Sequence, residues 1–123
     1  MNYKVLLLIL CSVGLSALAQ IFLKTGMATG AVQAAVATGG VAMARAVVSN
    51  GYVLLGLTLY GVGALTWLLV LARIDVSVAY PFVGLGFIVT LALAWLVLHE
   101  PIGLTRLVGT LLVVAGVVLV ARS

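Results

Sequence analysis

The sequence predicts an all-α integral membrane protein with four transmembrane helices, dimeric in its working form. Hydrophobic residues make up 66% of the 123-residue chain, and charged residues only 7%. A water-soluble domain carries charge on roughly a quarter of its residues, so this chain cannot cover a water-facing exterior. Its surface must meet lipid, where each apolar stretch satisfies its own backbone hydrogen bonds by forming a helix.

Four apolar stretches are long enough to serve as these helices, because about 20 apolar residues cross a hydrocarbon core of roughly 30 Å. They cover residues 4–24, 51–72, 76–98 and 103–121, and residues 1–123 are expected to form one domain. In the first stretch Lys4 precedes the apolar core, as in a signal peptide. It is longer than a signal core and three more spans follow, so we expect it to be retained.

The segment 25–50 is the ambiguous part of the chain. It is rich in Ala, Gly and Val and contains no Leu, Ile or aromatic residue. Such a composition is marginal on an insertion scale. The segment is therefore interpreted as a loop or an interfacial helix. The alternative is that it enters the bilayer, and a full crossing would raise the count to five spans.

Four spans place both termini and the turn at residues 73–75 on one side of the membrane. The cations divide evenly, with Lys4, Arg73 and Arg122 on that side and Lys24, Arg45 and Arg106 on the other. This balance gives no orientation by the positive-inside rule. Two interpretations stay open: copies insert both ways and pair antiparallel, or a partner or lipid-binding cations obscure the count.

Several function classes are not expected from this composition. The chain has two acids, one His and one Cys, and they form no cluster with metal-ligand spacing. No nucleophile has a base nearby, and the formal charge of +4 lies at helix ends. Cys11 has no partner for an intrachain disulfide. We therefore expect no enzyme activity, no metal, no cofactor and no nucleic-acid partner.

The first span carries a row of polar residues. Ser12, Ser16, Gln20 and Lys24 are each four residues from the next. This spacing stacks them on one helical face, and polar groups inside a bilayer tend to face a bundle interior or a wet pathway. The alternative is that the serines bond to their own helix or pack a helix contact. We expect this face to line a polar route.

The second span has Gly56, Tyr60, Gly63 and Trp67 alternately four and three residues apart on one face. Small residues allow helices to approach closely, and the aromatic rings can form the wall of a cavity. Packing explains this pattern as well as ligand contact does.

The third span contains Tyr80-Pro81 followed by Gly84 and Gly86. Proline removes a backbone hydrogen bond and bends a helix, and nearby glycines loosen it. Transmembrane helices carry Pro and Gly in any case, but their proximity favours a hinge formed by Pro81, Gly84 and Gly86.

Charged residues gather where the first and fourth spans approach one membrane surface. Lys24 and Arg106 are expected to bind an anionic phosphate, and Glu100 is expected to bind an amine or to pair with a cation. The alternative for Lys24 is that it snorkels to the lipid headgroups. In the fourth span, Gly109 and Gly116 are seven residues apart and predict contact with a partner helix.

The segments SALAQIFLK, SVAYPFVGLGFIV, HEP and GTLLVVAGVVL occur in this order over most of the chain. Together they resemble the drug/metabolite transporter superfamily, in particular its four-helix, small multidrug resistance-like branch. The resemblance implies a dimer, often antiparallel, with a substrate chamber between the first three helices of each copy. It also implies that Gly109 and Gly116 make the dimer contact.

One position departs from the multidrug exporters, which carry a glutamate in the first helix for proton or drug exchange. Counted back from Lys24, that position is Ser16, and neither acid of the chain lies within a span. The extended first loop and the SALAQ run instead resemble the flippase subunits for undecaprenyl-phosphate-linked aminoarabinose, used in lipid A modification, and their relatives.

That resemblance implies a bacterial inner-membrane flippase subunit that moves a polyprenyl-phosphate-linked sugar, as a homodimer or as a heterodimer with a paralogous subunit. Ser12, Ser16, Gln20, Lys24, Tyr60, Trp67, Tyr80, Glu100 and Arg106 are the predicted substrate-binding residues. The alternative functions are an exporter of cationic drugs or small metabolites and a membrane partner that transports nothing itself.

Overall fold

A computed structural model describes residues 2–123, and within this range the chain is helical without strands. The elements in order are α1 (Tyr3–Met27), α2 (Gly30–Thr38), α3 (Gly40–Ser49), α4 (Gly51–Leu71), α5 (Val76–Ala79), the 3₁₀ helix η1 (Tyr80–Phe82), α6 (Val83–Leu96) and α7 (Leu104–Ala121).

Among the described residues, four helical segments are long and apolar enough to cross a membrane: Tyr3–Met27, Gly51–Leu71, Val76–Leu96 and Leu104–Ala121, with mean hydropathy between 2.0 and 2.4. At a rise of 1.5 Å per residue, the shortest of them is about 27 Å long. The prediction of an all-α membrane protein with four spans is therefore confirmed. The third span combines α5, η1 and α6.

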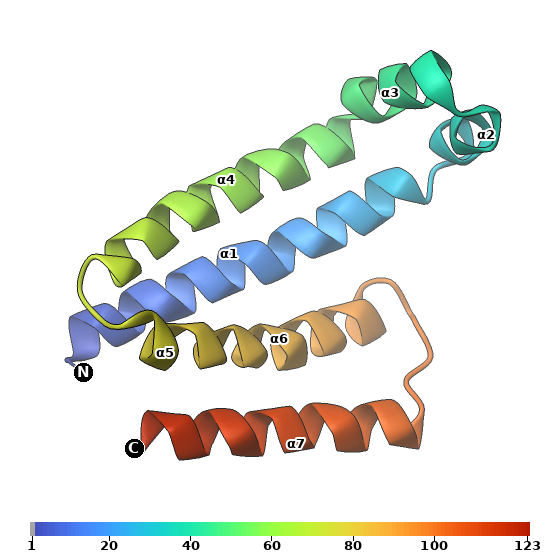
Figure 1. Ribbon diagram of the computed structural model, residues 1–123. Helices are drawn as coiled ribbons and strands as arrows, with labels where there is room; N and C mark the ends of the chain where they lie inside the picture. Colours follow the sequence, from blue (N-terminus) through green and yellow to red (C-terminus); the bar gives the residue numbers. More distant parts are fainter. Residues whose placement is uncertain (1) are drawn as a thin grey trace.

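Residues 25–27 of the ambiguous segment extend α1, and residues 30–49 form a pair of short helices beyond the ends of α1 and α4 (Figure 1). Helices α2 and α3 have nine and ten residues, which corresponds to roughly 15 Å each, so neither is long enough to cross a membrane. Gly39 and Gly40 join them with φ angles of 76° and 62°, in the left-handed region that glycine adopts without strain.

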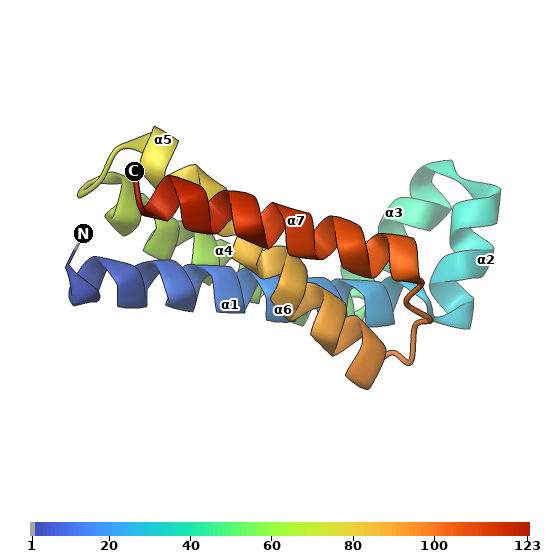
Figure 2. The same cartoon turned by 90° about the horizontal axis from the view of Figure 1, so that it is seen from below.

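The spans alternate in direction, and α1 lies between α4 and α6 (Figure 1). Both termini and the α4–α5 turn lie at one end, which we call the terminal end. Helices α2 and α3 and the α6–α7 connection lie at the opposite end, which we call the hairpin end. Figure 2 shows α6 running at an angle to α7.

Glycines bring α1 and α4 together over most of their length. A Cβ added to Gly26 would lie 2.6 Å from Val53 Cγ2, and one added to Gly56 would lie 2.8 Å from Leu23 Cγ. A Cβ on Gly63 would meet Leu15 Cβ and Ser16 Oγ at 3.3 Å. Gly56 and Gly63 therefore act as close-approach positions against α1, as small residues do between membrane helices.

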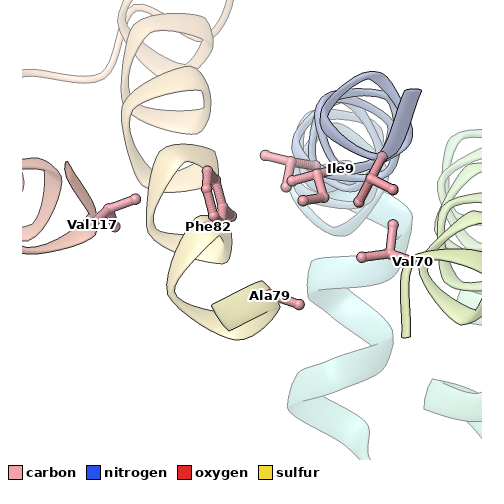
Figure 3. Close-up of a cluster of buried hydrophobic side chains, with 7 residues drawn as sticks. Ile9, Val70, Ala79, Phe82 and Val117 are labelled. Atoms are coloured by element: carbon pink, nitrogen blue, oxygen red, sulfur yellow. The ribbon is translucent and has the colours of Figure 1, made fainter. Parts of the chain in front are cut away.

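The buried apolar cluster sits towards the terminal end and joins all four spans (Figure 3). It consists of Val5, Ile9, Val13, Val70, Ala79, Phe82 and Val117. Towards the hairpin end burial within the spans is confined to the α1–α4 pair, where Ala19, Ile21, Val53 and Gly56 are buried. Among the described residues, α6 has no buried residue after Gly84 and α7 has none before Val117. The α1–α4 pair is therefore closely packed along its length, whereas α6 and α7 are packed against it mainly at the terminal end.

The α1–α4 contact can be tested by adding one methyl group at two positions of α4. Gly56→Ala places a Cβ within 3.0 Å of the Leu23 backbone nitrogen, whereas Gly61→Ala meets no atom of the described chain within 4 Å. Both changes gain the same helix propensity, but overpacking costs about 1–3 kcal/mol. We expect Gly56→Ala to lower the thermal unfolding midpoint in detergent and Gly61→Ala to leave it unchanged or raise it. Equal midpoints for the two variants would contradict the close contact.

Candidate functional site

A cavity of about 330 Å³ lies between α1, α4 and the third span. Its lining comes from Ser12, Val13, Ser16, Ala17 and Gln20 of α1, from Tyr60, Gly63, Ala64 and Trp67 of α4, and from Tyr80, Val83, Gly86, Phe87 and Thr90 of the third span. Within residues 2–123, neither α7 nor the α2–α3 pair contributes to this lining. We call it the central cavity.

The polar row of α1 divides into residues with different roles. Ser12 is 3% exposed, and its hydroxyl donates a 2.7 Å hydrogen bond to the Gly63 carbonyl oxygen of α4. Ser12 thus strengthens a helix contact at the edge of the cavity. Ser16 is half-buried and Gln20 is exposed, and both present polar groups to the cavity.

Aromatic side chains of α4 form another part of the wall. Tyr60 and Trp67 lie seven residues apart on the face that also carries Gly63 and Ala64. Because Gly63 and Ala64 are small, the space between the two rings stays open. Trp67 also packs against the buried apolar cluster, and this contact restricts the movement of its side chain.

The third span supplies a face that the sequence analysis recognised only at Tyr80. Val83, Phe87 and Thr90 are spaced by four and three residues and line the cavity together. Thr90 carries the one hydroxyl among residues 83–96. A single polar side chain within an apolar helix was the signal that could have identified this face. Tyr80, Tyr60 and Phe87 are 65%, 47% and 54% exposed, so the cavity is open on one side of the single chain.

The lining is electrically neutral. Its polar groups are hydroxyls, one amide and one indole. Both acids of the chain lie outside the spans: Asp75 precedes α5, and Glu100 lies in the α6–α7 connection. The cavity thus offers hydrogen bonds and aromatic faces, but no carboxylate to neutralise a cation.

The predicted charged residues lie at the hairpin end and do not line the cavity. Lys24 is in the last turn of α1, and Arg106 is in the first turn of α7. Arg106 donates a 3.3 Å hydrogen bond from Nη1 to the Pro101 carbonyl oxygen. Glu100 lies in the α6–α7 connection and is half-buried. The structure brings Lys24, Glu100 and Arg106 to the same end of the bundle, separate from the neutral lining.

The residues proposed for the hinge occupy an interruption in the third span. Pro81 lies in the 3₁₀ helix η1, between α5 and α6, and 3₁₀ turns within helices often mark hinges. A Cβ on Gly84 would lie 2.7 Å from Val117 Cγ2 of α7, and one on Gly86 would lie 3.3 Å from Val13 Cγ1 of α1. The two glycines are therefore packing positions in this conformation, and their role in movement stays a prediction.

The predicted dimer contact lies on an uncovered face of α7. Gly109 and Gly116 are exposed, and a Cβ built on either meets no atom of the described chain within 4 Å. This face is available to lipid or to a second chain, and its pairing stays a prediction.

The comparison with family models decides the class of the protein. The model of the EamA-like transporter family matches residues 3–122. The chain belongs to the EamA-like transporter family. Comparisons with curated proteins and with solved structures found no match.

Membership of the EamA-like family confirms the resemblance to the drug/metabolite transporter superfamily at the level of the family and fold. Together with the four spans, it makes the chain a multi-pass membrane protein and a membrane transporter. The central cavity of this EamA-like transporter combines convergent polar groups with aromatic walls, the features typical of small-molecule sites, and its role as the substrate site stays a prediction.

The hydrogen bond from Ser12 to Gly63 is expected to stabilise the cavity wall. Ser12→Ala removes this link between α1 and α4, whereas Thr58→Ala removes a bond of 2.9 Å to Leu54 within α4 itself. Interhelical hydrogen bonds in membranes contribute about 0.6 kcal/mol on average. We expect Ser12→Ala to lower the free energy of unfolding in detergent by about this amount and Thr58→Ala to change it less. A larger loss for Thr58→Ala would contradict this assignment.

Proposed function

We propose that this EamA-like transporter is a flippase subunit that moves a polyprenyl-phosphate-linked amino sugar across the bacterial inner membrane. The observation that carries the proposal is the neutral central cavity, which combines hydroxyl, amide and aromatic groups in a chain without an acid in its spans. Such a lining suits the ring and hydroxyls of a sugar, whose amine can lose its proton on desolvation, better than a quaternary organic cation, which keeps its charge and requires a counter-charge.

The sugar fits the polar and aromatic parts of the lining. Ser16, Gln20 and Thr90 provide donors and acceptors for sugar hydroxyls, and the rings of Tyr60 and Trp67 provide flat apolar faces. The volume of about 330 Å³ lies within the range of small-molecule sites, roughly 300–1,000 Å³. The exposed rings of Tyr60, Tyr80 and Phe87 mark the open side of the cavity. In this proposal the lipid tail extends through that side and remains in the bilayer.

The phosphate is assigned to the hairpin end. Lys24 lies in the last turn of α1 and Arg106 in the first turn of α7, both at the hairpin end. Cations at the ends of membrane spans lie at the level of the lipid phosphates. Charge-assisted hydrogen bonds to a phosphate are stronger than neutral ones. In this proposal the two cations bind the phosphate at the surface, and Glu100 interacts with the amine of the sugar before the sugar enters the cavity.

A second chain completes the transporter in this proposal. The open side of the cavity and the uncovered face of α7 both require covering, since one chain exposes much of its apolar surface. Gly109 and Gly116 are the proposed contact, in a homodimer that is parallel or antiparallel or in a heterodimer with a paralogous subunit. Bending at Pro81 would open the cavity to either membrane surface in turn.

The headgroup site is tested by translocation of a polyprenyl-phosphate amino sugar in proteoliposomes. We expect Lys24→Ala and Arg106→Ala each to lower the rate at least tenfold, because a hydrogen bond to a charged group contributes about 1.5–3 kcal/mol. Arg45→Ala removes a cation from α3 at the same end and should leave the rate unchanged. Size-exclusion chromatography checks that the oligomer persists. Normal rates for both test variants would exclude the headgroup site. No translocation by the wild-type chain would exclude a working homodimer and leave a heterodimer subunit or a non-transporting partner.

The alternative function is export of cationic drugs, and the aromatic wall favours it. Tyr60, Trp67 and Tyr80 line the cavity, and aromatic faces attract cations. A proton-coupled exporter of this kind releases protons when a drug displaces them from a carboxylate in the membrane. Since neither acid lies within a span, we expect no proton release when quaternary ammonium compounds are added to the detergent-solubilised protein. Stoichiometric release would replace the flippase proposal with the exporter.

A further inference from the structure

A second groove lies towards the terminal end and shares no lining residue with the central cavity in the part of the chain that the structure describes. It has a volume of about 430 Å³. Its lining consists of Lys4, Leu7, Leu8, Cys11, Leu69 and Arg73. We call it the terminal groove. Neither the transport route nor the phosphate site at the hairpin end uses it.

The groove follows one face of each of the two closely packed helices. Leu7, Leu8 and Cys11 are three, four and seven residues after Lys4, so all four share a face of α1. On α4 and the turn after it, Arg73 follows Leu69 by four residues. One cation from α1 and one from the turn after α4 therefore converge on one groove, and both are exposed.

The charged and apolar parts of the groove are separated along the membrane normal. Lys4 is in the first turn of α1, and Arg73 lies two residues beyond the end of α4, so both reach the headgroup level. Cys11 lies seven residues deeper, about 10 Å along the helix. Leu7 and Leu69 are 59% and 52% exposed and cover the depth between.

We infer that the terminal groove binds an anionic phospholipid of the surrounding bilayer. The phosphate would lie between Lys4 and Arg73, and an acyl chain would lie along Leu7, Leu8 and Leu69. Charge complementarity selects this occupant, because a zwitterionic lipid also carries a cation that the two basic residues repel.

Snorkelling of each cation to the headgroups accounts for exposure of Lys4 or Arg73 taken singly. It does not account for their convergence on a groove whose apolar floor continues towards the membrane centre. Asp75 is the nearest acid in sequence to Arg73 and makes no side-chain cap for α5. Even with its charge counted, Lys4 and Arg73 leave the groove net positive. The inference does not depend on the identity of the transported substrate.

The test is retention of lipid by the purified full-length protein, measured by native mass spectrometry with equimolar phosphatidylglycerol and phosphatidylcholine. We expect the wild type to retain phosphatidylglycerol preferentially. The double variant Lys4→Gln/Arg73→Gln should weaken that binding about thirtyfold, from about 1 kcal/mol for each cation near the surface. The control Arg45→Gln/Arg122→Gln removes the same charge outside the groove and should retain the lipid as the wild type does.

Two further measurements separate the groove from other causes. Lys4→Arg/Arg73→Lys keeps both charges and should retain phosphatidylglycerol, and a single Arg73→Gln variant serves if the double variant does not fold. Excess inorganic phosphate should not displace the lipid, because the apolar floor contributes to binding only when an acyl chain is present. Undiminished retention by the glutamine variants, an equal loss in the control, or displacement by phosphate would overturn the inference.

Discussion

The close contact between α1 and α4 is the constraint on which the rest of the structure depends. In lipid no hydrophobic force draws apolar helices together, so association relies on close packing and interhelical hydrogen bonds. Gly26, Gly56 and Gly63 remove the side chains that would separate the pair, and the short backbone distance allows Ser12 to reach the Gly63 carbonyl oxygen. The pair then acts as one wall. Its two edges carry different chemistry: the central cavity on the side of the third span and the terminal groove towards the termini.

The third span is held against this wall mainly at the terminal end. Ala79 and Phe82 pack with Ile9 and Val70 in the buried cluster (Figure 3), whereas the later turns of α6 carry Phe87 and Thr90 along the open cavity. The 3₁₀ helix at Tyr80–Phe82 contributes Phe82 to the buried cluster and directly precedes the turns of α6 that line the cavity. A rigid wall combined with an interrupted span makes the third span the part that would move in the proposed cycle, with the buried cluster as its fixed end.

Hydropathy predicted the four spans well, because a long uncharged segment in lipid can satisfy its backbone hydrogen bonds only as a helix here. The polar row of α1 predicted a face, and Ser12, Ser16 and Gln20 do line the cavity. Lys24 shares their spacing but does not line the cavity. Periodicity predicts which face of a helix a residue occupies, but it does not predict how far along the helix the neighbouring helices extend. For residues 25–50 the sequence left a loop and an interfacial helix open and did not predict the division into α2 and α3, because an Ala- and Gly-rich segment has no clear apolar period. The inward face of the third span was missed except at Tyr80 of η1, since a helix that is apolar all round does not reveal which side packs inward.

Charge in this chain is arranged by depth, and this arrangement bears on how an anionic lipid could be moved. Lys24 and Arg106 lie at the hairpin end, Lys4 and Arg73 lie at the terminal end, and the cavity between them is neutral. A charge at the membrane centre is costly, so in the proposed cycle a phosphate is held most easily at the surfaces, while the sugar would pass the centre with its amine deprotonated. In an antiparallel pair, each membrane surface would present the hairpin end of one copy beside the terminal end of the other. Both surfaces would then carry the same set of cations, and a phosphate leaving one would meet an equivalent site at the other. A parallel pair or a heterodimer would make the two surfaces unequal and favour one of them as the resting place of the phosphate.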